Sequence, residues 1–133
     1  MIYSATDQAS RGIYAAAETN GNLAIAASYS DQSKLSPKTV LASALANIPL
    51  LVEDMVSGSV QGKLVADKVY SVGMAGGIGE LALNPELSKT IPPEVAKDVQ
   101  ALMAAIKSGQ IKVPAISEPG QSEQYDLGAL KAK

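Results

Sequence analysis

The sequence predicts an α/β fold with three layers, in which helices cover both faces of a mostly parallel β-sheet. Segments typical of strands alternate with segments typical of helices along the chain, which is the order that builds such sheets. The apolar run at residues 23–27 has no alternating polar positions, as expected for a strand that is covered on both faces. With 133 residues, of which 47% are hydrophobic, the chain is long enough for one domain with a real core.

The first part of the chain predicts a strand, a helix and a second strand, in that order. Residues 1–5 are apolar and compatible with a strand, and Asp7 then stands where an N-cap would precede a helix over residues 11–18. Asn20-Gly21-Asn22 tolerates positive φ angles and therefore ends this helix. The strand at residues 23–27 follows directly.

A long amphipathic helix is predicted from Pro37 to Gly58, because apolar side chains recur there at spacings of three and four. Those apolar positions are Val40, Leu41, Ala44, Leu45, Ile48, Leu51, Val52, Met55 and Val56. Pro49 lies inside this segment, so we expect a kink or a break there. The proline ring clashes with the carbonyl of Leu45, and the proline nitrogen carries no proton to donate.

The second half of the chain predicts three short strands and one further helix. Two strands are expected at residues 68–74 and 79–83, around a cluster of glycines, and Asn84-Pro85 ends the second of them. Two prolines open a helix at residues 92–109, which a glycine ends. Residues 111–113 are expected to form a last strand.

The composition excludes several functional classes. The chain has neither cysteine nor histidine, which removes disulfides, the usual zinc sites, thiol nucleophiles and imidazole triads. No pair of carboxylates is placed for acid–base catalysis, so we predict a non-enzymatic protein with no metal and no cofactor. The net charge of -2 leaves no basic surplus for a phosphate backbone, and we expect no nucleic-acid partner. Proline and glycine interrupt the apolar stretches, so no direct membrane span is expected.

Several short strings occur in an order and at distances that are typical of a known family. They are Asp31-Gln32-Ser33, Val40-Leu41-Ala42-Ser43, Gly58 to Lys63, Asn84-Pro85, Ile91-Pro92-Pro93-Glu94-Val95, and Ile106 to Pro114. Together they resemble the C-terminal part of the basic membrane protein family. Its members are substrate-binding components of ABC importers, and several are similar to purine nucleoside receptors. The resemblance implies a partial type I periplasmic-binding-protein fold over residues 1–114. Residues 115–133 are polar and are expected to form a C-terminal tail.

The resemblance also implies a function. A family member closes two α/β lobes on a small solute and presents it to an ABC permease. This chain would then be a solute-binding component for a purine nucleoside or another small polar ligand, acting in the periplasm or at the cell surface. No signal peptide precedes Ile2, so we expect the chain to begin inside a longer, lipoprotein-like protein with an N-terminal lobe. The alternative is a truncated or assembly fragment that binds no ligand by itself and self-associates as a homo-oligomer through an exposed lobe interface.

Five residues are candidate ligand contacts, and three of them lie just beyond the strand at residues 23–27. Asp31 and Gln32 follow the carboxyl end of this strand, which is where open α/β sheets bind ligands. The resemblance places Asp31 where nucleoside-binding members use an aspartate to accept hydrogen bonds from ribose hydroxyls, although a solvated loop acid or N-cap is the simpler interpretation. Tyr29 is placed either to stack on a base or sugar or to serve packing alone.

The other two candidates lie in a loop that departs from the family. Members carry a glycine-rich loop after the first strand, whose backbone approaches the ligand, whereas Asp7 and Gln8 place side chains there. These two residues either make replacement hydrogen bonds or, for Asp7, cap the helix. Ala46 also stands where nucleoside binders of the family carry a lysine. Both departures point to another small polar ligand or to a lost binding function, and we expect this chain alone to bind nucleosides weakly or not at all.

Overall fold

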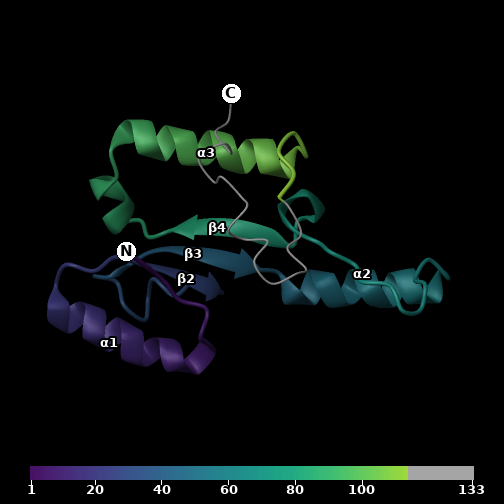
Figure 1. Ribbon diagram of the computed structural model, residues 1–133, viewed down its shortest axis with the longest axis horizontal. Helices are drawn as coiled ribbons and strands as arrows, with labels where there is room; N and C mark the ends of the chain where they lie inside the picture. The colour runs from purple at the N-terminus through teal and green to yellow at the C-terminus, as the bar shows by residue number, and fades with distance from the viewer. Residues whose placement is uncertain (114–133) are drawn as a thin grey trace, which may run out of the picture.

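The fold is built on a four-stranded sheet, and the computed structural model describes residues 1–113 (Figure 1). Across the sheet the strands lie in the order β1 (Ile2–Tyr3), β2 (Ile25–Tyr29), β3 (Val40–Ala46) and β4 (Gly79–Leu83). The strands β1, β2 and β3 are parallel, and β4 runs antiparallel to β3. The prediction of an α/β fold with a mostly parallel sheet is therefore confirmed.

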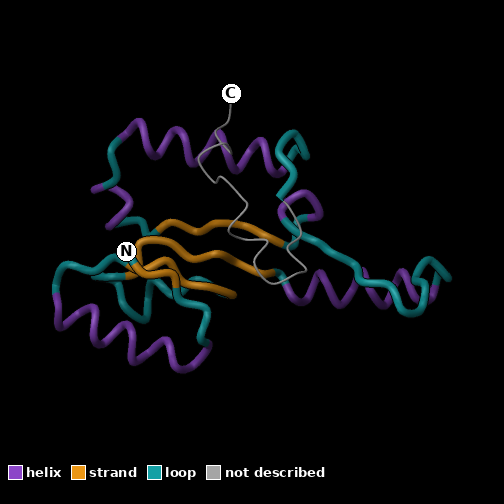
Figure 2. The backbone as a smooth tube through the Cα atoms, in the orientation of Figure 1, coloured by secondary structure: helices purple, strands orange, loops and turns teal. Residues whose placement is uncertain are grey.

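Helices flank this sheet on both sides. The helices among residues 1–113 are α1 (Ser10–Asn20), α2 (Ile48–Val60) and α3 (Pro93–Lys107), with short 3-10 helices η1 (Asp7–Ala9), η2 (Met74–Gly76) and η3 (Leu87–Thr90). Figure 1 shows α1 and α3 on opposite sides of the sheet. Helix α2 extends away from it, which Figure 2 shows most clearly. The sheet thus lies between two of the helices, and the third has little to pack against.

The core lies between α1 and the parallel strands. Tyr14 and Ala17 of α1 are buried in one cluster with Ile25 and Ala27 of β2 and Val40 of β3. Ile25 lies directly opposite Val40 in the sheet, and the register shifts by one residue just after this pair. Because removal of this apolar surface from water holds α1 against β2 and β3, the loops that join β1, α1 and β2 have fixed positions.

The predicted N-cap at Asp7 is wrong, whereas the predicted end of the first helix is confirmed. Asp7 begins η1 with a φ of 47°, and α1 starts at Ser10 without a side-chain cap. The left-handed backbone of Asp7 separates it from the regular turns of α1. At the other end, Gly21 has a φ of 76° and donates its N–H to the oxygen of Ala17 at 3.0 Å, as expected of a C-cap glycine.

The predicted long helix from Pro37 to Gly58 is wrong, because its first half is the strand β3. Pairing with β2 on one side and β4 on the other satisfies the backbone of this segment. Helix α2 begins after Asn47, whose Oδ1 accepts a hydrogen bond from the N–H of Leu50 at 3.1 Å. Pro49 lies in the first turn of α2, where no N–H is needed. The interruption expected at Pro49 is thus a strand-to-helix boundary.

Two further predicted elements are confirmed. The strand at residues 79–83 is β4, which ends just before Asn84. The helix with two opening prolines is α3, which starts at Pro93. Gly109 follows its end with a φ of 77°, as predicted for a terminating glycine.

The strands predicted at residues 68–74 and 111–113 are wrong. In the first segment Val69 is 88% exposed, and no strand among residues 1–113 pairs with this segment. In the second, the N–H of Ile111 donates to the oxygen of Ala105 in α3 at 3.0 Å. The backbone therefore turns back onto the helix. The tail predicted at residues 115–133 lies outside the described residues.

Candidate functional site

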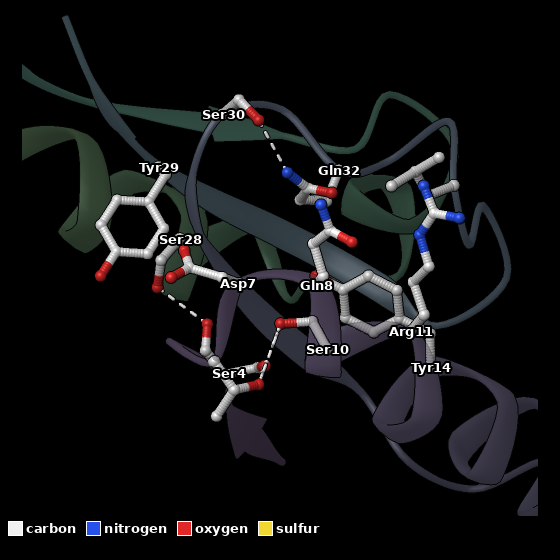
Figure 3. Close-up of a pocket in the computed structure, with 12 residues that line it drawn as sticks. Ser4, Asp7, Gln8, Ser10, Arg11, Tyr14, Ser28, Tyr29, Ser30 and Gln32 are labelled. Atoms are coloured by element: carbon white, nitrogen blue, oxygen red, sulfur yellow. Dashed lines mark hydrogen bonds between the residues drawn. The ribbon is translucent and has the colours of Figure 1, made fainter. Parts of the chain in front are cut away.

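The candidate site is a polar hollow at the carboxyl ends of β1 and β2. Because these strands are parallel, the loops that follow them meet at one edge of the sheet. The hollow has a volume of about 260 Å³ and lies between the loop that leads into α1 and the loop that leads to β3 (Figure 3). Its lining consists of Ser4, Thr6, Asp7, Gln8, Ser10, Arg11, Tyr14, Ser28, Tyr29, Ser30, Gln32 and Leu35.

A cluster of hydroxyl groups fixes the geometry of one wall. The Oγ atoms of Ser4 and Ser10 are 2.9 Å apart, and Thr6 Oγ1 lies 3.1 Å from Ser10 Oγ and 3.3 Å from Ser4 Oγ. Ser4 is 1% exposed and Ser10 7% exposed. The hydroxyl of Ser28 donates to the backbone oxygen of Ser4 at 2.8 Å. One of these hydrogen bonds is buried and three are partly buried, and together they join the end of β1 to α1 and β2, so this wall of the hollow is not a free loop.

Two residues of the hollow hold strained backbone conformations. Asp7 has a φ of 47° and Tyr29 a φ of 73°, in the left-handed region that favours glycine. Such conformations cost on the order of 1–3 kcal/mol each and are concentrated at functional sites. Tyr29 is 52% exposed, so packing of its ring does not by itself explain the strain. The two conformations make this hollow a candidate functional site, although positive φ is not confined to it: Asp67 has a φ of 59° and lines neither this hollow nor the one beside it.

Asp31 borders a second hollow, of about 320 Å³, which lies beside the first. Its lining includes Tyr29 and Ser30, together with Leu45, Ala46 and Asn47 where β3 leads into α2. Tyr29 and Ser30 border both hollows. The two hollows are therefore neighbours that share Tyr29 and Ser30.

The loop itself already binds the carboxylate of Asp31. The backbone N–H of Ser33 donates to Asp31 Oδ1 at 2.9 Å, which is an Asx turn. This bond, the Ser33 side chain and the charge of Lys34 hold the pKa of Asp31 below its ordinary value, although burial acts in the opposite direction. The carboxylate is therefore ionised at neutral pH and can accept hydrogen bonds from a ligand.

Four of the five predicted contact residues line the first hollow together. These are Asp7 and Gln8 from the β1–α1 connection and Tyr29 and Gln32 from the other loop. Gln32 is tied in place, because its Nε2 donates to Ser30 Oγ at 2.7 Å and its backbone N–H to Ser43 Oγ at 3.1 Å. Asp31 lies outside this group, in the neighbouring hollow.

Sequence reasoning missed Arg11, Tyr14 and the hydroxyl cluster. Arg11 is the only arginine of the chain, and it follows Asp7 by four residues at the start of a helix. This four-residue spacing of opposite charges was the signal in the sequence that could have identified Arg11 as a candidate site residue. Tyr14 is buried and supplies an apolar wall to the hollow. The hydroxyl cluster could not be found in the same way, because serine and threonine near a strand end are common in loops of every kind.

The side chains along this edge are of kinds that bind small polar ligands. Within residues 1–113, no group of three or more acidic, histidine or cysteine side chains is placed to hold a metal ion. In the same part of the chain, no helix combines the length and the apolar character needed to cross a bilayer.

Hydroxyl, amide, carboxylate, guanidinium and phenol groups converge on the carboxyl edge of the parallel strands, and these are the groups that orient small polar ligands.

No curated protein matches the chain. A family model described as ABC transporter substrate-binding protein PnrA-like matches residues 1–117, which include every helix and strand described above. The chain therefore belongs to the PnrA-like family of ABC transporter substrate-binding proteins.

Proposed function

We propose that this chain binds a small polar solute at the carboxyl edge of its parallel strands, as the solute-binding component of an ABC importer. One observation carries the proposal: polar side chains from two loops converge on a hollow that buried hydrogen bonds hold in shape. Membership of the family supports it, because the family consists of substrate-binding proteins, which are generally not enzymes. In this role the protein works outside the cytoplasm and presents its solute to a membrane permease.

A purine nucleoside is the first solute to test in the hollow that Asp31 borders. An ionised carboxylate accepts charge-assisted hydrogen bonds from the vicinal hydroxyls of a ribose. Two features weaken this match. The N–H of Ser33 already occupies Asp31 Oδ1, and Ala46 offers only a methyl group at the adjoining strand end. We therefore expect weak nucleoside binding, and submicromolar affinity for adenosine, guanosine or inosine would contradict that expectation.

The proposal is tested by isothermal titration of the purified chain with nucleosides, monosaccharides and amino acids. At least one class is expected to bind. Tyr29→Gly removes a ring that borders both hollows and keeps a residue suited to the left-handed backbone. This variant is expected to lose affinity about fivefold or more, the size of one lost contact of about 1 kcal/mol.

The matched control is Tyr70→Ala, which removes a tyrosine that lines neither hollow. It is expected to bind as the parent chain does. If no class of small polar solute binds, or if both tyrosine variants lose affinity equally, the proposed function is wrong.

A second candidate function is self-association, and the exposed face of α2 favours it. Helix α2 has no buried residue. Its side chains at every fourth position are apolar and 50–83% exposed: Ile48, Val52, Val56 and Val60. A stripe of this kind is typical of a surface that meets a partner. Light scattering at rising protein concentration tests this self-association. A dimer that is lost in the variant Val56→Lys and kept in the variant Ser57→Lys would support it. A parent chain that stays monomeric at high concentration would contradict it.

A further inference from the structure

We propose that the hollow between Asp7 and Arg11 binds a small zwitterion, with a cationic group at the Asp7 end and an anionic group at the Arg11 end. The inference rests on the proposed function, because it names the class of solute for the hollow. A zwitterion carries two opposite charges, unlike a nucleoside. Its proposed position is the hollow on the α1 side of Tyr29 and not the neighbouring hollow that Asp31 borders.

Two opposite charges in this hollow are not neutralised by each other. The single ion pair found among residues 1–113 joins Lys89 to Glu86, although Asp7 and Arg11 stand only four residues apart. A regular helix would bring such a pair into contact. The left-handed φ of 47° at Asp7 interrupts the helix, and Figure 3 shows the two side chains at opposite ends of the hollow. The strained backbone therefore keeps the two charges apart and available to a ligand.

The end of the hollow that holds Asp7 suits a cationic group. Figure 3 shows the Asp7 carboxylate and the Tyr29 ring at this same end, with the Ser28 hydroxyl. A carboxylate gives a charge-assisted hydrogen bond to an ammonium group. The face of a tyrosine ring attracts cations as well. The two residues with strained backbones thus supply the two groups that recognise a cation.

The opposite end suits a carboxylate. The guanidinium of Arg11 presents a planar fork that matches a carboxylate with two parallel hydrogen bonds. The side-chain amide of Gln8 lies between the two ends and adds a donor. Arg11 also lies in the first turn of α1, where the helix dipole favours negative charge.

The size and net charge of the hollow limit the ligand further. At about 30 Å³ for each water molecule, a volume of about 260 Å³ holds roughly nine waters, or a similar number of non-hydrogen atoms. A free amino acid of medium size has these dimensions. One carboxylate and one guanidinium give the lining no net charge, so a dipolar neutral molecule complements it better than a phosphate or a polyamine.

The test uses calorimetric titration of the full chain with L-valine, L-asparagine and L-glutamine. Each amino acid is paired with its N-acetyl and α-amide derivatives, which remove one charge and leave the protein unaltered. At least one free amino acid is expected to bind, and each derivative of it at least tenfold more weakly. Arg11→Gln and Asp7→Asn are expected to weaken binding by a similar factor, since asparagine also tolerates the left-handed backbone at residue 7.

Lys97→Gln and Asp98→Asn are the matched controls, because they remove single exposed charges on α3. They are expected to leave affinity unchanged. Binding of inosine or D-ribose but of no amino acid would overturn the inference and leave the proposed function standing. Amino-acid binding that resists the loss of either charge would also overturn it, whereas the absence of any solute binding would overturn both.

Discussion

Replacement of Asp7 by glycine is expected to stabilise the protein and to weaken the hollow as a binding site. The φ of 47° at Asp7 is left-handed, and such a backbone costs a residue with a Cβ about 1–2 kcal/mol. Glycine relieves that cost but loses about 0.5–1 kcal/mol more chain entropy on folding. The net gain lies between about 0 and 1.5 kcal/mol, or up to roughly 6 °C in the unfolding temperature of a chain of this size. Urea unfolding followed by circular dichroism measures this difference.

Gly21→Ala is the reverse substitution and serves as the control, because it adds a Cβ at a residue with positive φ. Gly21 has a φ of 76°, and an added Cβ would meet no atom within 4 Å. Any change in stability therefore reports the backbone alone, and a loss of about 1 kcal/mol is expected. If Asp7→Gly lowers stability while Gly21→Ala behaves as expected, the Asp7 side chain contributes more than its backbone costs. The argument that strain is retained at residue 7 for function would then be refuted.

Three further outcomes follow from the contacts in the structure. Ser10→Ala removes one member of the hydroxyl cluster and is expected to lower the free energy of unfolding by about 1–2 kcal/mol, whereas Ser59→Ala on exposed α2 should leave it unchanged. Asn84→Ala breaks hydrogen bonds to Pro37 O, Val40 O and two backbone N–H groups at the end of β4, and a loss of about 2–4 kcal/mol is expected in the same assay. The lowered pKa of Asp31 contributes stability that is present above the ordinary aspartate pKa of 3.8 and is lost as the pH falls through the folded pKa. Unfolding curves recorded across this acid range should therefore show a shallower loss of stability for Asp31→Asn than for the parent chain.

The elements that local residues determine were predictable from the sequence. The strand β2 begins in the apolar run at residues 23–27, α1 ends at a glycine with positive φ, and α3 opens with prolines. Each of these signals acts over a few neighbouring residues. The sheet class followed from the alternation of strand and helix segments and from the apolar run at residues 23–27, because a strand without polar alternation is expected to be covered on both faces.

The strand β3 was not predictable, because its apolar residues match the spacing of a helix as well as that of a strand. Its sequence, Val-Leu-Ala-Ser-Ala-Leu-Ala, has apolar residues that match a helical spacing as well as a strand. Alanine favours a helix in isolation. The pairing with β2 and β4 decided the outcome, and that pairing depends on residues about fifteen positions away in β2 and more than thirty positions away in β4. Tertiary context therefore overrode local preference here.

The candidate site was predictable in position but not in composition. The rule that ligands lie beyond the carboxyl ends of parallel strands located the loop with Tyr29 and Gln32, and the family resemblance pointed to Asp7 and Gln8; the structure brings these four residues to one hollow. It gave no reason to separate Asp31 from them. The contribution of Arg11 depends on the left-handed turn at Asp7, and an aspartate tolerates such a turn without requiring it, so residue type alone did not predict the turn.

The most direct test of the account is a nuclear magnetic resonance titration of the isotopically labelled chain with the solute that calorimetry selects. Backbone amide shifts are expected to change at residues 4–11 and 28–33, which form the two walls of the hollow. Amides of the exposed helix α2 should stay constant and serve as an internal control. Shift changes confined to α2, with none at the carboxyl edge of the sheet, would contradict the assignment of this edge as the solute site.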